Sequence, residues 1–365
     1  MRLAMVIGEQ RLAMEQRMLN RLAVGLTVEG VQVIRIVPEG LPASLIAEGE
    51  RRMALAPRFE ARLRSLRWTR RVHIRRLAEA LADNVPDALY LLGRDAWAFG
   101  LDLATELDRP AILEAWSASQ AASLPRPASN AHLAAVTAPC EGIAKVVRER
   151  VGADLTAIVP LGASPPRRAT QVLDGGQPPA VAILGGARDV AAYAVMLNGL
   201  ARVIKEHTGL QIVIELRGPH EHDIWRVAER SGLIGAVSAI GSASQHQALL
   251  TRCDLVILPE HYGELRSVLL DVMAMSVPVV AAADPALDML IDGVTARLVS
   301  SPSANAWADA VSTLLATPEQ ARALGAGGRE RIIAAHRSSD QVARMMDLLQ
   351  RLAGRSTLVF PGQAG

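Results

Sequence analysis

The chain has 365 residues, of which 50% are hydrophobic, 21% are charged and only 3% are aromatic, and its formal net charge is +2. This length is enough for two domains with substantial cores, and the small net charge gives no support to nucleic-acid binding. No stretch reaches the roughly 18 apolar residues that a membrane-spanning helix requires.

The first half of the chain predicts a parallel α/β domain. Residues 3–7 form a short apolar run typical of a buried strand, a helical pattern over 14–29 follows, and a second strand pattern covers 31–37. Such a strand–helix–strand unit calls for a parallel sheet. Further strands are predicted at 88–92, 111–113, 134–136 and 156–159, and a helix at 97–107.

The stretch from Arg51 to Arg76 carries ten arginines in 26 residues. Apolar residues such as Leu55, Phe59 and Leu63 interleave at helical spacing, which predicts a basic amphipathic helix, or a helix and a turn. Three hypotheses stay open for it. The arginines form a solvated face over the first sheet, or they touch an anionic membrane surface, or they meet a nucleic acid or protein partner. We expect no nucleic-acid partner.

A linker and a second α/β half follow. Residues 160–179 contain five prolines and three glycines, a composition typical of a linker. Beyond it, strands are predicted at 181–184, 212–216, 237–240, 255–258 and 277–281, and helices at 190–207, 224–231, 245–252 and 265–275.

These patterns predict two doubly wound, Rossmann-like parallel-sheet domains that face a cleft. The expected divisions are a first domain at 1–165, a linker at 166–179, a second domain at 180–335, and a C-terminal helix and tail at 336–365 that returns to the first domain. In sheets of this kind, ligands bind beyond the carboxyl ends of the strands.

The two cysteines, Cys140 and Cys253, have no CxxC partner and no histidine cluster nearby. We therefore expect reduced, buried thiols. The first apolar run is about five residues long, too short for the core of a signal peptide. Together these features predict a cytoplasmic protein, with the basic stretch as a means of peripheral attachment to the inner membrane face.

Four stretches of the second half share the order and spacing of a known family. They are SQHQALLTRCDLVILP at 244–259, DVMAMSVPVV at 271–280, IDGVTARLV at 291–299 and PEQARALGAGGRERI at 318–332. Together they resemble the retaining glycosyltransferases of family 4, which have the GT-B fold. The resemblance implies a metal-independent hexosyltransferase that moves a sugar from a nucleotide sugar to an acceptor, with no cofactor.

The resemblance also implies a donor site in the second domain and an acceptor side in the first. The catalytic pair would be Glu264 and Arg266, and Gly8 and Arg94 would lie on the acceptor side. The expected donor-binding residues are Gly185, Gly186, Arg188, Arg217, His261, Tyr262, Asp271 and Asp288.

The sequence departs from the family in the donor motifs. The family's first glutamate falls on Gly263, so that Glu264 stands one residue late, whereas the second acid is present as Asp271. The family's arginine and lysine, which neutralise the donor diphosphate, fall near Gly186 and Ala191, and only Arg188 is close by. These departures support an alternative, an inactive GT-B protein that binds a ligand or a partner.

Each candidate side chain has a structural interpretation beside the functional one. Arg266 either binds phosphate at a helix start or is a surface arginine paired with an acid, and Glu264 either contacts the sugar or complements the helix dipole. The carboxylate of Asp271 has apolar neighbours, so we expect it to be paired with another side chain or bound to a ligand, and we favour the ribose as that ligand. His261 and Tyr262 either stack on the donor or cover the strand end.

The sequence GPHEHD at 218–223 invites a metal interpretation. His220 and His222 lack the helical i,i+4 spacing of a zinc pair, so a solvated loop is the better interpretation. No metal site is predicted.

Overall fold

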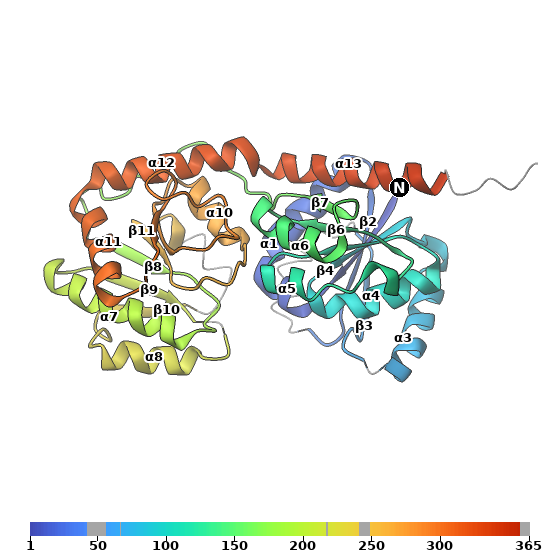
Figure 1. Ribbon diagram of the computed structural model, residues 1–365, viewed down its shortest axis with the longest axis horizontal. Coiled ribbons are helices and arrows are strands. Elements are labelled where there is room, and N and C mark those ends of the chain that lie inside the picture. Colours follow the sequence, from blue (N-terminus) through green and yellow to red (C-terminus); the bar gives the residue numbers. More distant parts are fainter. Residues whose placement is uncertain (42–55, 66, 217, 241–248, 358–365) are drawn as a thin grey trace, which may run out of the picture. The chain divides into compact units, whose positions relative to one another are not determined.

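The computed structural model of the protein describes residues 1–41, 56–65, 67–216, 218–240 and 249–357. The chain forms two compact units. Unit 1 comprises Met1–Gly162, Glu264–Ser267 and Ser338–Gly365, and unit 2 comprises Ala163–Gly263 and Val268–Arg337. Each unit is built on its own parallel sheet (Figure 1).

Unit 1 contains a seven-stranded sheet in the order β3-β2-β1-β4-β5-β6-β7, and every neighbouring pair is parallel. Apart from Arg2 at the start of β1, its central strands β1 and β4 are apolar, as expected for a sheet covered on both faces. The strands are β1 (Arg2–Ile7), β2 (Gln32–Pro38), β3 (Arg58–Ala61), β4 (Ala88–Leu92), β5 (Ala111–Glu114), β6 (Leu133–Ala138) and β7 (Thr156–Ile158).

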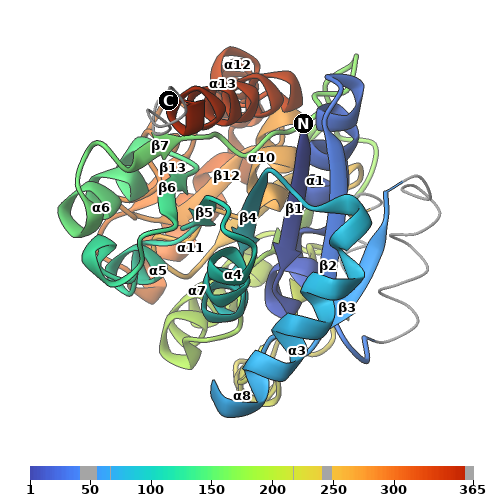
Figure 2. The same cartoon turned by 90° about the vertical axis from the view of Figure 1, so that its right-hand side faces the viewer.

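The helices of unit 1 connect consecutive strands, and the last one comes from the end of the chain. They are α1 (Glu9–Val28), α3 (Arg67–Ala80), α4 (Arg94–Leu107), α5 (Ala118–Ala122), α6 (Glu141–Val151) and α13 (Ser338–Thr357). Helix α13 lies along α1, where Gly25 leaves room for Val342 (Figure 2). On α4, Gly100 gives the same room to Leu91 of β4, which lets the helix pack closely on the strand.

Unit 2 contains a six-stranded parallel sheet in the order β10-β9-β8-β11-β12-β13. The strands are β8 (Ala180–Ile183), β9 (Gln211–Glu215), β10 (Val237–Ile240), β11 (Leu255–Leu258), β12 (Val279–Ala282) and β13 (Arg297–Val299). The helices are α7 (Val190–Glu206), α8 (Glu221–Arg230), α10 (Ser267–Ala274), α11 (Ala304–Ala316) and α12 (Pro318–Ala335). Helix α10 begins in the segment that groups with unit 1.

Both sheets have one point where the strand order reverses. In unit 1 it lies between β1 and β4, and in unit 2 between β8 and β11. At such a point, the right-handed crossovers that follow the two neighbouring strands pass to opposite faces of the sheet. The loops at the carboxyl ends of these strands therefore separate and leave space for a ligand. The residues after these four strands therefore define where a site is expected.

The predicted fold class of two doubly wound parallel sheets is confirmed. The predicted basic amphipathic helix is wrong over residues 58–61, which form β3 at the edge of the sheet, whereas 67–76 are helical as the start of α3; residues 51–55 lie outside the described residues. Edge strands carry charged side chains readily, and this strand reads RFEA, so its apolar pattern is weak. The first half of the predicted helix at 245–252 lies outside the described residues.

Helix α12 offers a matched test of the packing in unit 2. A Cβ on Gly325 would lie 2.0 Å from the carbonyl oxygen of Ser276, whereas one on Gly328 would make ordinary contacts, with the Thr295 oxygen at 3.4 Å. Both substitutions gain the same helix propensity, about 1 kcal/mol. We expect Gly325→Ala to unfold at lower denaturant than Gly328→Ala, with a difference of about 1–3 kcal/mol from overpacking. Equal stabilities would contradict this close approach.

Candidate functional site

The reversal point of unit 2 is organised by one carboxylate, that of Glu260. Glu260 follows β11, and its oxygens accept three backbone N–H groups of the loop after β8. Oε2 accepts from Gly186 at 2.5 Å, and Oε1 accepts from Arg188 at 2.7 Å and from Asp189 at 3.0 Å. Asp189 is also the N-cap of α7, since its side chain accepts the N–H of Ala192. The two loops at the reversal point are thus joined by an internal anion.

Two further acids bind backbone amides of the same two loops. Glu215, buried at the end of β9, accepts the N–H of Gly185 at 3.3 Å. Asp284, after β12, accepts the N–H of Gly263 at 2.5 Å and that of Ala286 at 3.0 Å. The carboxyl edge of this sheet therefore has several of its loop amides bound by carboxylates of the chain itself.

The glycines of the loop after β8 are required by this arrangement. A Cβ on Gly185 would lie 2.3 Å from the hydroxyl oxygen of Tyr193 and 2.9 Å from Glu260 Oε2. Gly218 is equally constrained, because a Cβ there would lie 2.0 Å from the carbonyl oxygen of Gly186. The backbone thus approaches the Glu260 carboxylate as closely as it would approach a ligand.

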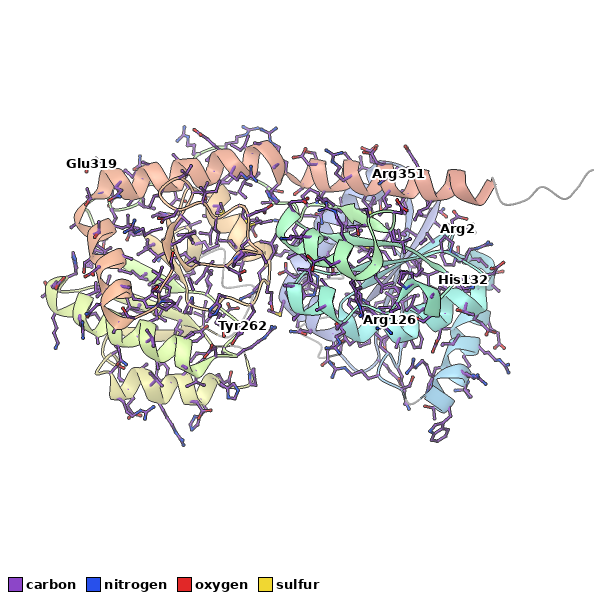
Figure 3. The ribbon with its side chains drawn as sticks, in the orientation of Figure 1. Arg2, Arg126, His132, Tyr262, Glu319 and Arg351 are labelled. Carbon is purple, nitrogen blue, oxygen red and sulfur yellow. The ribbon has the colours of Figure 1, made fainter. Side chains whose placement is uncertain are left out.

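The aromatic residue of the second loop lies in this acidic surrounding. Tyr262 projects from the loop after β11 and remains 38% exposed (Figure 3). Its partial burial and the neighbouring acids Asp189 and Glu260 raise the pKa of Tyr262 to about 12. The phenol therefore stays neutral and can donate or accept a hydrogen bond near neutral pH.

The structure brings together five of the predicted donor residues: Gly185, Gly186, Arg188, His261 and Tyr262 all lie on the two loops that Glu260 joins. Asp271, on α10, and Asp288, after β12, are partly buried in the same unit. Arg217 lies outside the described residues.

The predicted catalytic pair belongs to the segment that groups with unit 1. Glu264 forms an isolated bridge with Ser117, and the next N–H, of Leu265, is donated to the carbonyl of Trp116 at 3.1 Å. Arg266 is buried, with 8% exposure, so the surface-arginine interpretation is wrong. The N–H of Ser267, the first residue of α10, is bound by the carboxylate of Glu15 at 3.1 and 3.3 Å.

A buried ion cluster occupies the reversal point of unit 1. Arg11, with no exposed surface, donates two hydrogen bonds to Glu114 at 2.8 and 2.6 Å, and its third nitrogen lies 3.7 Å from Glu15. The indole of Trp116 lies over the guanidinium at 4.6 Å. Burial acts to lower the pKa of Arg11, but the two carboxylates outweigh it and hold that pKa above its ordinary value. The guanidinium is therefore charged, and its charge is balanced inside the protein.

A cavity of about 420 Å³ lies in the same unit, at the carboxyl ends of β2 and β3. It lies next to both predicted acceptor-side residues, because its wall includes Glu9 and Asp95, the neighbours of Gly8 and Arg94. Gly8 is constrained there, since a Cβ would lie 1.9 Å from Asp95 Oδ1. The lining residues are Glu9, Pro38, Glu39, Ala61, Arg62, Leu63, Arg64, Ser65, Thr69, His73 and Asp95.

The charges of this cavity are mixed. Arg62 pairs with Glu39 at 2.6 Å, and Arg64 lies 3.8 Å from Glu9 and 3.7 Å from Asp95. The hydrogen bond and charge of Arg62 hold the pKa of Glu39 below its ordinary value. The wall offers carboxylates and guanidinium groups together, which suits a ligand rich in hydroxyl groups.

The histidines of GPHEHD do not form a metal site among the described residues. His220 is the N-cap residue of α8 and lies 3.4 Å from Asp223, within the same turn. In the part of the chain that the structure describes, no three His, Cys, Asp or Glu side chains are placed to hold a metal ion. Nor is any described helix both long and apolar enough to cross a membrane.

The chain was compared with known proteins. Residues 178–317 match the family described as "Glycosyl transferases group 1". A D-inositol 3-phosphate glycosyltransferase of Segniliparus rotundus is 28% identical over 155 residues, which cover 40% of this chain and 34% of that protein. An alpha-D-kanosaminyltransferase of Streptomyces kanamyceticus is 32% identical over 126 residues, or 34% and 33% of the two chains. The matches thus span about a third of each curated relative.

Solved structures resemble the chain over nearly its whole length. Anabaena HepE, solved in complex with UDP and glucose, has a TM-score of 0.77 at 13% identity, covering 96% of this chain and 100% of its own. Sucrose-phosphate synthase of Thermosynechococcus elongatus has a TM-score of 0.75 at 16% identity, covering 97% and 99%. The predicted GT-B fold and the resemblance to glycosyltransferases of the family 4 type are confirmed.

Sequence reasoning missed Glu260 and the Arg11 cluster. A usable signal existed for the first, because Glu260 directly follows the proline that ends a buried strand, at the expected ligand edge. For the cluster there was little signal, since Arg11 and Glu114 are 103 residues apart in the sequence.

The Arg11 cluster generates a stability prediction. Glu114→Ala should lower the free energy of unfolding by about 3–5 kcal/mol, because it leaves a buried guanidinium without its bidentate partner. The double variant Arg11→Met with Glu114→Leu should recover part of this loss, since apolar residues of similar size replace the bidentate pair while Glu15 keeps the hydrogen bond from the Ser267 N–H. Chemical denaturation measures both.

The control is Glu141→Ala, which breaks the exposed pair with Arg148 and should change stability little. A Glu114→Ala variant as stable as this control would show that the buried pair has no such importance.

Proposed function

We propose that the protein is a nucleotide-sugar-dependent glycosyltransferase, retaining and metal-independent. The observation that supports this most is the position of the family match, since residues 178–317 include both loops at the reversal point of unit 2. Unit 2 would bind the donor, and unit 1 the acceptor. Transfer from a nucleotide sugar requires few protein groups, because the main needs are stabilisation of the leaving diphosphate and fixed positions for the two substrates.

The donor residues have distinct roles in this proposal. Arg188 would offset the charge of the diphosphate as the sugar bond breaks. Asp271 would bind the ribose hydroxyls, and His261 with Tyr262, whose rings are nearly parallel at 6.3 Å, would stack on the base or the sugar. HepE was solved with UDP-glucose, so UDP-sugars are the first donors to test.

The acceptor would bind in the cavity of unit 1. A volume of about 420 Å³ is enough for a ligand of the size of one or two sugar rings. The carboxylates of Glu9, Glu39 and Asp95 would accept hydrogen bonds from acceptor hydroxyls, and Arg64 would bind an anionic substituent. The nearby Gly8 and Arg94 belong to the same edge of the sheet.

A second candidate is an inactive GT-B protein that binds a ligand or a partner. The internal carboxylates of unit 2 favour it, because Glu215, Glu260 and Asp284 already bind loop amides that a donor would use. The two candidates differ in whether a nucleotide sugar can enter this edge at all.

The outer face of α3 supports peripheral attachment to an anionic membrane. Trp68 and Val72, one turn apart, are 74% and 51% exposed, and Arg71 and Arg75 are exposed beside them. A tryptophan flanked by arginines suits the interface between headgroups and acyl chains. Another arginine of the basic stretch is neutralised within unit 1, since Arg70 pairs with Asp102 of α4 at 3.0 Å.

Donor binding is tested by calorimetric titration with UDP, GDP, ADP and their sugars. We expect one nucleotide sugar to bind, and Arg188→Ala to weaken its affinity at least about tenfold through loss of a phosphate contact. The control is Arg230→Ala, at the exposed end of α8. Failure of every nucleotide to bind at millimolar concentration would eliminate the enzyme and leave the inactive protein.

Membrane attachment is tested by sedimentation with vesicles that contain phosphatidylserine. The double variant Arg71→Gln, Arg75→Gln should weaken binding on the order of tenfold or more, and raised salt should weaken the wild type in the same way. Trp68→Ala should weaken it without changing the salt dependence. The control Arg202→Gln, Arg230→Gln removes the same charge from unit 2. Equal binding by the α3 variants and this control would rule out α3 as the attachment surface.

A further inference from the structure

We propose that Glu260 is an internal competitor of the ligand: its carboxylate occupies the place where the loop after β8 would bind a phosphate group, and an anionic ligand binds there only when Glu260 leaves. The nature of the ligand rests on the proposed function. The competition itself does not, because it concerns groups of this chain alone.

The contacts of the carboxylate are those of a bound anion. Its two oxygens bridge the N–H groups of Gly186, Arg188 and Asp189 at 2.5, 2.7 and 3.0 Å. Successive backbone N–H groups that converge on one anion form a nest, which proteins use for phosphate and carboxylate groups alike. Here the Glu260 carboxylate is the anion bound in the nest.

The shape of the loop also fits an anion at this place. Gly185 and Gly186 have no side chains, and a Cβ would lie 2.9 Å from Glu260 Oε2 in the first case and 3.4 Å in the second. The loop is therefore open towards the carboxylate and towards any group that replaces it. A larger side chain at Gly185 would exclude the internal and the external anion together.

Glu260 is able to leave this place. It is partly buried rather than enclosed, and it lies in a loop after Pro259, outside β11. Glu215 and Asp284 also hold these two loops, through the N–H groups of Gly185 and Gly263, and these contacts persist when Glu260 swings outward. The exchange is then local, with three amide hydrogen bonds passing from a carboxylate to a phosphate.

Competition also predicts which ligands are disfavoured. With Glu260 in place, the described residues of this edge include four acids, Asp189, Glu215, Glu260 and Asp284, alongside Arg188. A polyphosphate is therefore repelled by these carboxylates, and it also finds the backbone N–H donors of the loop already bound to Glu260. Removing the carboxylate relieves both, so the gain in affinity should be larger for an anion than for a neutral sugar.

The test uses the full chain with inorganic pyrophosphate as the probe. In the wild type we expect slow exchange of the amide hydrogens of Gly186, Arg188 and Asp189, measured by hydrogen–deuterium exchange. In Glu260→Ala this protection should fall, and pyrophosphate should restore it. By calorimetry, pyrophosphate should bind Glu260→Ala at least about tenfold more tightly than the wild type. Glucose should show no such gain.

Two further variants keep the outcome clear. Glu260→Gln preserves the size of the side chain and removes its charge, so it should fold like the wild type and show a smaller gain in pyrophosphate affinity. Glu319→Ala removes one acid from the first turn of α12, away from Tyr262 in Figure 3, and should show none.

The proposal is overturned if folded Glu260→Gln binds pyrophosphate no better than the wild type, or if pyrophosphate does not restore amide protection in Glu260→Ala. A failure of the proposed function is a separate result. In that case no nucleotide sugar binds or is turned over by the wild type or by Glu260→Gln, while pyrophosphate still distinguishes the two proteins.

Discussion

Backbone N–H groups at the carboxyl edge of a parallel sheet require acceptors, and this requirement determines how unit 2 is built. An unpaired amide is costly when it is shielded from water, about 1–3 kcal/mol. A ligand-binding edge leaves some amides to solvent or ligand, whereas here Glu260 accepts three of them and Asp284 accepts two. The same bonds fix the loops that carry Arg188 and Tyr262, so loop order and ligand access depend on one carboxylate.

In unit 1, too, side chains of the chain itself occupy the reversal point, but here they form a buried ion cluster. Arg11 fills the reversal point between β1 and β4, and Glu114, Glu15 and Trp116 neutralise and cover it. A charge buried in this manner holds its neighbours in place strongly, because moving any partner exposes another charge. The cavity of unit 1 lies elsewhere on this edge, at the carboxyl ends of β2 and β3, where Arg64 and Asp95 are more accessible than Arg11.

The sequence was sufficient for the fold because the strands are apolar runs separated by helical patterns, as at 255–258. It was insufficient where long-range partners decide the structure. The strand at 58–61 has a charged pattern and is defined only by pairing with β2. The amides that bind Glu260 are 71 to 74 residues away in the sequence, so no local pattern indicates that its carboxylate points inward. Glu264 and Arg266 were found by motif position, but the sequence did not indicate that their segment groups with unit 1.

The electrostatics of the β8 loop bear directly on the proposed donor site, which is either adapted or lost. Two unit charges about 4 Å apart repel by roughly 4 kcal/mol at an effective dielectric constant of 20, which is nearly a thousandfold in affinity at about 1.4 kcal/mol for each factor of ten. A diphosphate therefore cannot share the nest with the Glu260 carboxylate, even with Arg188 beside it. The loop is bound either by the chain or by a ligand, and an active enzyme must gain enough from its other donor contacts to drive that exchange.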